Sequence, residues 1–167
     1  MPYRNLILRS LYIIIVIIPV NSISAQSYDS KVEKLATEIE SQVIEWRHWF
    51  HQNAELSNRE FKTSKRIAEI LRDMGYKPQT NIAKTGVVAV LNGNKRGPVV
   101  ALRADIDGLP IKERVNIPWA SKMTGVYNGE TVPVMHACGH DTHIGILLGV
   151  AKILKDMKDQ ILSLIHI

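Results

Sequence analysis

The chain has 167 residues, of which 46% are hydrophobic and 22% are charged, and its formal net charge is +5. This balance is typical of a folded globular protein and excludes a disordered chain or a collagen-like repeat. A single cysteine excludes an internal disulfide framework. The basic residues form no stripe or motif of the kind found in nucleic-acid-binding proteins, so we expect no nucleic-acid partner.

Residues 1–25 have the pattern of a secretory signal peptide. Arg4 and Arg9 precede an apolar run over residues 11–18, and small residues follow it up to Ala25. The apolar run is too short to span a bilayer by itself. We therefore expect cleavage after Ala25, export to the periplasm or the medium, and no stable membrane insertion afterwards. The alternatives are an uncleaved anchor or a core strand.

Downstream of this leader, the chain begins with two helical patterns. Apolar residues recur at helical spacing over residues 32–50, with charged residues between them, which predicts an amphipathic helix. A second such pattern covers residues 61–74. Ser57 or Asn58 is suited to cap its N-terminus, and Gly75 is expected to end it.

Extended segments and a last helix follow. Residues 86–91 and 99–103 are short apolar runs separated by a turn rich in Gly and Asn. Runs without polar alternation indicate a sheet covered on both faces, so we predict an α/β fold with a mostly parallel sheet flanked by helices. Residues 115–135 look irregular. A final helix, apolar on almost all sides and therefore expected to be buried, should begin at Asp141 or Thr142.

The segment at residues 136–143 reads HACGHDTH and concentrates metal-ligand side chains. Imidazole and thiolate are ligands of zinc and similar metals. In an extended chain Cys138 and His140 point the same way, and at the start of a helix His140 and His143 share a face. A helix N-terminus also favours a thiolate over a thiol. The segment therefore predicts a metal site; the alternative is a buried cysteine with capping histidines.

Two carboxylates follow the extended run at 99–103. Asp105 and Asp107 lie just beyond it, at the sheet edge where open α/β folds bind ligands. Asp105 is suited to orient a metal-bound histidine from behind. Asp107 either points to the same side or caps the turn. The alternative is an ordinary turn in which both aspartates hydrogen-bond to the local backbone.

Together these segments resemble the M20 family of metal-dependent amidohydrolases. The resemblance covers about residues 30–160 and is closest to the branch of N-acyl-amino-acid amidohydrolases, hippurate hydrolases and auxin-conjugate hydrolases. Its most specific motif is the HACGHDTH string. The other matching residues are 102–111, 119–121, 147–149, Arg47, His51, Asn53, Glu55, Leu56, Ser57 and Glu60.

This resemblance implies a zinc-peptidase-like catalytic domain that carries two divalent metal ions, Zn or Mn, and an inserted lid domain. It implies Cys138 and His140 as metal ligands and Asp105 as the catalytic aspartate that orients and tunes the metal site. Arg103 stands where the wider family has a histidine ligand, which is typical of this branch. The implied reaction is hydrolysis of the amide bond of an N-acyl amino acid or short peptide conjugate, by a possible homodimer joined through the lid.

The resemblance also implies parts that these residues do not include. Paired glutamates, one of them the general base, should follow the final helix, with further histidine ligands and the lid domain beyond them. We therefore expect residues 26–161 to be the N-terminal part of the catalytic domain and to be inactive alone.

Residues 162–167 resemble the in-frame translation of a transposon-end adapter, and we expect them to be non-native. The alternative is an ordinary C-terminal strand.

A second function also remains open, that of an exported metal-binding protein without catalysis. It would leave Asp105 without a role.

Overall fold

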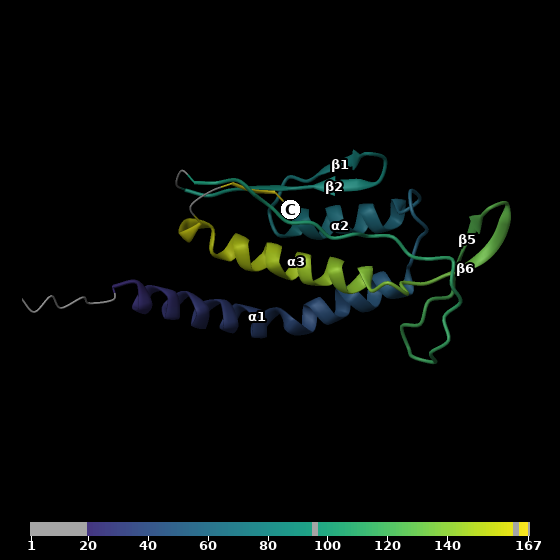
Figure 1. Ribbon diagram of the computed structural model, residues 1–167, viewed down its shortest axis with the longest axis horizontal. Helices are drawn as coiled ribbons and strands as arrows, with labels where there is room; N and C mark the ends of the chain where they lie inside the picture. The colour runs from purple at the N-terminus through teal and green to yellow at the C-terminus, as the bar shows by residue number, and fades with distance from the viewer. Residues whose placement is uncertain (1–19, 95–96, 162–163, 167) are drawn as a thin grey trace, which may run out of the picture.

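The computed structural model describes residues 20–94, 97–161 and 164–166. This part of the chain contains both helices and short strands, which confirms the predicted α/β class (Figure 1). The helical elements are α1 (Val20–Gln52), α2 (Phe61–Asp73), α3 (His140–Asp156) and a 3₁₀ turn, η1 (Lys158–Gln160). The strands are β1 (Gln79–Ile82), β2 (Gly86–Val88), β3 (Val90–Asn92), β4 (Val100–Ala101), β5 (Met123–Tyr127), β6 (Glu130–Val134) and β7 (Leu164–His166).

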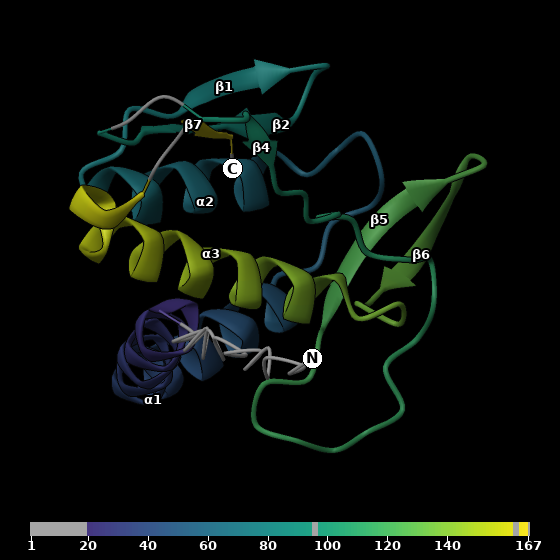
Figure 2. The same ribbon diagram turned by 60° about the vertical axis from the view of Figure 1, so that its left-hand side comes forward.

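Helix α3 lies between α1 on one side and α2 on the other, and α1 runs antiparallel to it (Figures 1 and 2). Two glycines let α1 and α3 approach closely. A Cβ atom on Gly149 would lie 2.8 Å from Val43 Cγ2, and one on Gly145 would lie 3.3 Å from the Val43 carbonyl oxygen. The small residues of α3 therefore fix where α1 packs against it.

The main core fills the space between the three helices and strands β2 and β3. A smaller core lies below the β5–β6 hairpin, which projects from one end of the molecule (Figure 2). The main core consists of Phe50, Ile67, Ile70, Leu71, Tyr76, Ala89, Leu91, Ile144, Leu148 and Ala151. Most of these positions come from the helical patterns that the sequence predicts.

The expected mostly parallel sheet is not found in the described residues. Among the named strands, only β4 and β7 pair in parallel, whereas β1–β2, β3–β7 and β5–β6 are antiparallel. One reason is local: Ala83 and Lys84 adopt φ angles of 45° and 95°, which reverse the chain and make β1 and β2 a hairpin. The predicted strand at 86–91 is also divided at Ala89, and the one at 99–103 is paired only over β4.

Strand β7 lies between β3 and β4 and pairs with both. The alternative interpretation of residues 162–167, an ordinary C-terminal strand, expects a strand at this position. The backbone pairing does not depend on where the residues come from, so a non-native origin stays a prediction.

Two further expectations about the last part of the chain are wrong. Residues 115–135 contain the β5–β6 hairpin, whose turn places Asn128 at φ 51° and Gly129 at φ 85°. Two positive φ angles at an Asn-Gly pair are typical of the tight turns that match the twist of paired strands. Helix α3 begins one residue before the predicted start, and its Ile146 is 55% exposed. Part of the helix surface between its two packed sides is therefore exposed.

The ends of α2 confirm one prediction and correct another. Gly75 adopts φ 80° just after the helix, as expected for a residue that ends it. The N-cap position is Glu60, not Ser57 or Asn58. The Glu55 carboxylate instead accepts the backbone N–H groups of Lys62 and Thr63, at 3.2 and 2.8 Å. This carboxylate satisfies N–H groups that the first turn leaves free.

The predicted signal peptide lies mostly outside the described residues, since 1–19 are not described and 20–25 form the start of α1. Its cleavage and the export of the protein stay predictions. Every helix in the described part of the chain is too short or too polar to cross a membrane.

Candidate metal centre

The loop that carries the two aspartates is held by backbone hydrogen bonds on both sides. The Gly108 N–H donates to the Glu55 carbonyl at 2.6 Å, and Leu109 exchanges two hydrogen bonds with Met135, at 2.8 and 3.1 Å. Met135 directly precedes the 136–143 segment. The whole β5–β6 hairpin separates the aspartates from this segment along the chain. The backbone hydrogen bonds nevertheless bring them to the N-terminus of α3.

Three side chains converge at this point. Asp105, His140 and His143 each offer a ligand atom, and these atoms all lie within 4.8 Å of one another. Both histidines belong to the first turn of α3, and their ring centroids are 5.3 Å apart. One carboxylate oxygen and two imidazole nitrogens form a donor set that suits a divalent cation such as zinc or manganese. The residues therefore fit the kind of metal that the sequence predicts.

A second aspartate orients one of these histidines. The Nδ1 atom of His140 lies 2.9 Å from Asp107 Oδ1 and 3.0 Å from the Asp107 carbonyl oxygen. Both oxygens accept, so Nδ1 carries the hydrogen and Nε2 is left to bind a metal. The carboxylate that touches the His140 ring is therefore Asp107, a residue whose role the sequence analysis left open.

Asp105 has a different partner. Its Oδ1 atom accepts hydrogen bonds from Arg103 Nε and Nη2, at 3.1 and 2.8 Å. These bonds lower the pKa of Asp105, so its carboxylate is ionised at neutral pH. The structure thus places Asp105 in the ligand group rather than behind His140. Its catalytic role, implied by the family resemblance, stays a prediction.

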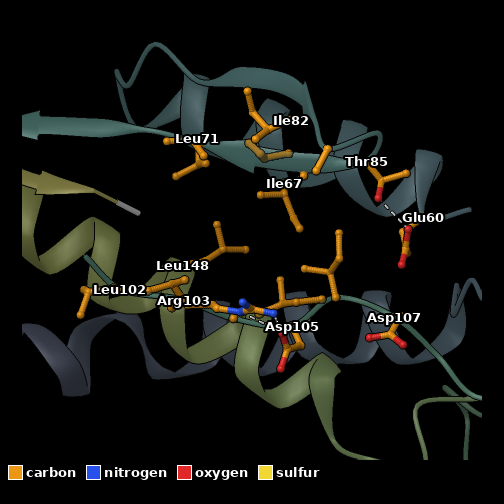
Figure 3. A pocket seen from close by; sticks show the side chains of 18 of the residues that line it. Glu60, Ile67, Leu71, Ile82, Thr85, Leu102, Arg103, Asp105, Asp107 and Leu148 are labelled. Carbon is orange, nitrogen blue, oxygen red and sulfur yellow. Dashed lines mark hydrogen bonds and ion pairs between the residues drawn. The ribbon is translucent and has the colours of Figure 1, made fainter. Parts of the chain in front are cut away.

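An apolar cavity of about 630 Å³ borders the carboxylates of Asp105 and Asp107 (Figure 3). In Figure 3, Leu102, Arg103 and Asp105 lie along one side, and Ile67 and Ile82 lie opposite them. The Thr85 hydroxyl donates a hydrogen bond of 2.7 Å to the buried Glu60 carboxylate, and both residues line another part of the cavity. The polar side chains Asp105 and Asp107 therefore stand where an apolar cavity meets the metal-ligand group.

Cys138 is exposed and lies outside the group formed by Asp105, His140 and His143. The extended conformation that would align Cys138 with His140 is not found, because Gly139 adopts φ 85° between them. A left-handed residue turns the chain sharply into the helix, and glycine adopts it without strain. The role of Cys138 as a metal ligand stays a prediction.

His136, also part of the predicted segment, has a different environment. It is 4% exposed, and neither ring nitrogen has a hydrogen-bonding partner within the described residues. Burial lowers the pKa of His136 to about 4, so the imidazole is neutral at neutral pH. It lies outside the ligand group.

Comparisons with known proteins show which family the chain resembles. The model of a family described as peptidase family M20/M25/M40 matches residues 101–166. Thermostable carboxypeptidase 2 of Saccharolobus solfataricus is 46% identical over 134 residues, which cover 78% of this chain and 32% of that protein. The N-acyl-L-amino acid amidohydrolase of Geobacillus stearothermophilus is 42% identical over 131 residues, which cover 78% of this chain and 33% of that protein.

A solved structure shares the fold. The Bacillus subtilis YXEP protein, described as a dinuclear metal binding peptidase from the M20 family, superposes with a TM-score of 0.69 at 35% identity. The match covers 78% of this chain and 35% of that protein. The chain thus spans about a third of the length of the curated relatives it matches.

Proposed function

Because this chain belongs to the peptidase family M20/M25/M40, we propose that it forms part of a metal-dependent amidohydrolase that cleaves the amide bond of N-acyl amino acids. The observation that carries the proposal is the convergence of Asp105, His140 and His143 within 4.8 Å. Two relatives support the reaction class, since carboxypeptidases and N-acyl-amino-acid amidohydrolases both hydrolyse amide bonds. The substrate class follows the second of these relatives.

The side chains have separable tasks in this proposal. The imidazoles of His140 and His143 and the Asp105 carboxylate bind the ion, which is Zn²⁺ or Mn²⁺. Asp107 keeps a proton on His140 Nδ1 and so fixes the face that His140 presents. Arg103 hydrogen-bonds the Asp105 carboxylate and lowers its pKa further. A divalent ion bound here supplies Lewis acidity to the amide carbonyl and lowers the pKa of a water molecule.

A centre of two ions is supported by the description of the YXEP structure as dinuclear. The general base and the ligands that complete such a centre are expected outside these residues. The active unit is therefore the natural protein that contains them, and its substrates include N-acyl amino acids or short peptide conjugates.

The test is to purify the full natural protein without chelators and to measure its metal content and its hydrolysis of N-acetyl amino acids. We expect bound Zn or Mn, with turnover that a chelator abolishes and added metal restores. His140→Ala should lose both metal and turnover. His48→Ala is the matched control, since His48 belongs to α1 and stacks on Trp119, with ring centroids 3.7 Å apart, outside the ligand group. A protein that holds metal but hydrolyses no acylated amino acid would refute catalysis and leave a metal-binding function.

A further inference from the structure

A buried polar cluster joins the end of α1 to the start of α3. Its centre is Asp141, which is 1% exposed. Asp141 Oδ2 lies 3.0 Å from His51 Nδ1 and 3.2 Å from Arg47 Nε. A buried carboxylate is costly unless it is paired and hydrogen-bonded, and here both donors come from α1. The two helices are therefore joined at this point by charge-assisted hydrogen bonds.

The same imidazole reaches a third segment. His51 Nε2 lies 2.7 Å from Glu113 Oε2, and His51 is 9% exposed. This bond is the main cause that lowers the pKa of Glu113. Each ring nitrogen of His51 therefore lies within hydrogen-bond distance of a carboxylate oxygen. His51 thus links Asp141 to the loop that follows the two aspartates of the metal site.

The position of this cluster follows from how α1 and α3 pack. On each helix the contacting residues are four apart and therefore lie on one face. Because the helices are antiparallel, these residues form one row along the interface. The row begins with the apolar contact of Val43 with Gly149 and ends with the polar contact of His51 with Asp141. The row consists of Val43, Arg47 and His51 on α1 and of Gly149, Gly145 and Asp141 on α3.

The cluster lies directly next to the metal-ligand group. Asp141 follows His140 in the chain, and both belong to the first turn of α3. The ring of His140 is oriented by Asp107, whereas its backbone is anchored by the neighbouring Asp141. Movement of Asp141 would carry His140 with it, because the two share a peptide bond.

We propose that His51 is a positioning residue for the metal centre, which it serves by holding Asp141 and thereby His140. This inference rests on the proposed function, because it assigns a support to that same site. Residues that orient metal ligands from behind typically contribute about 10- to 100-fold in metal affinity. His51 acts on His140 only through Asp141, so we expect its loss to weaken metal affinity by about 10-fold.

The experiment compares His51→Gln with His51→Asn in the full natural protein. An asparagine amide nitrogen takes the place of Nδ1 and keeps the bond to Asp141, whereas a glutamine amide nitrogen lies nearer to Nε2 and Glu113. Co²⁺ is the metal used, since calorimetry gives its affinity and its visible absorption reports the ligand geometry. His48→Asn is the control on the same helix. We expect about 10-fold weaker Co²⁺ binding and an altered spectrum for His51→Gln only.

The outcomes separate this inference from the proposed function. If the parent protein binds no Co²⁺, the metal site itself is refuted, and the role of His51 with it. If the parent binds Co²⁺ and His51→Gln binds equally well with the same spectrum, only the positioning role is refuted. The positioning role is also refuted if His51→Asn weakens Co²⁺ binding as much as His51→Gln does.

Thermal unfolding shows whether each variant is folded. Should His51→Gln lack a cooperative transition, Arg47→Met replaces it, because the Arg47 side chain is 47% exposed and methionine keeps its length without an N–H donor. Arg47→Met removes the other donor to Asp141, so weaker Co²⁺ binding is expected again. Unchanged affinity in this folded variant would overturn the link from Asp141 to His140 on which the proposal depends.

Discussion

Tyr76 shows how one buried polar side chain joins two helices. It lies three residues beyond the end of α2, is 5% exposed, and its hydroxyl donates to the Ala151 carbonyl in α3 at 2.7 Å. Burial is the main cause that raises the pKa of Tyr76 to about 12. The folded protein thus keeps this hydroxyl protonated at a pH where the unfolded chain begins to lose the proton.

This leads to a prediction for Tyr76→Phe. At pH 7 the variant should lose about 1 kcal/mol in the free energy of unfolding, since one hydrogen bond is lost and a carbonyl is left without its partner. Because the pKa is raised on folding, the contribution of Tyr76 is fully present below about pH 10. It is lost as the pH rises toward 12, so the difference between parent and variant should shrink. Urea unfolding from pH 7 to 11 measures this difference; a constant value would contradict the assignment.

At the residue level, the sequence predicted the site only in part. His140 belongs to the HACGHDTH string, and its ligand chemistry was evident from the cluster of histidines. The sequence assigned the orienting role to Asp105 and left Asp107 open, because two carboxylates two residues apart look alike until the backbone of Gly108 and Leu109 is placed. Glu113 is more than 60 residues from His51, and no local pattern connects them.

At the level of elements, the α1–α3 contact depends on Gly149. A methyl group there would meet Val43 Cγ2 at 2.8 Å, which is closer than two carbon atoms pack. The Val43 side chain is branched at Cβ and stiff, so it has little freedom to move away. Close packing of α1 on α3 is therefore possible only with a very small residue at this position.

We predict that Gly149→Ala destabilises the protein by about 1 kcal/mol. Overpacking costs about 1–3 kcal/mol, and the better helix propensity of alanine offsets about 1 kcal/mol of it. In a Val43→Ala background the same change should be neutral or stabilising, since the clashing methyl group is absent. Denaturant unfolding of both single variants and the double variant measures the coupling. Strictly additive effects would show that the two residues do not meet.

The helices were more predictable from sequence than the strands for a physical reason. A helix pattern such as residues 61–74 repeats over several turns, and Gly75 marks its end. The β1–β2 hairpin turns at Ala83 and Lys84, where residues other than glycine adopt positive φ angles, and the sequence shows no turn signature there. The Asn128-Gly129 turn did carry such a signature, but the flanking strands lack the alternation that would reveal a hairpin.

At the scale of the whole molecule, the early part of α1 for which burial is described lies at the surface. Residues 28–34 are exposed, and the first partly buried side chain of the described part of α1 is Leu35. Cleavage after Ala25, which the signal-peptide pattern predicts, would place this exposed stretch near the new N-terminus.

We predict that the exported protein begins at Gln26 and that this form is as stable as one that retains residues 1–25. The expected difference in the free energy of unfolding is within about 0.5 kcal/mol, as for surface changes that break no buried contact. N-terminal sequencing of protein recovered outside the cytoplasm, with unfolding curves of both forms, provides the check. Recovery of the protein with Met1 intact would contradict cleavage.

The four-residue spacing shared by α1 and α3 has a consequence for how this region tolerates insertions. Adding one residue anywhere between Val43 and His51 would rotate everything after it by about 100° around the helix axis. If Val43 stayed against Gly149, His51 would turn away from Asp141; if His51 kept its place, a side chain other than Val43 would face the glycines. The length of this stretch of α1 is thus as constrained as the identity of its residues, even though much of its surface faces water.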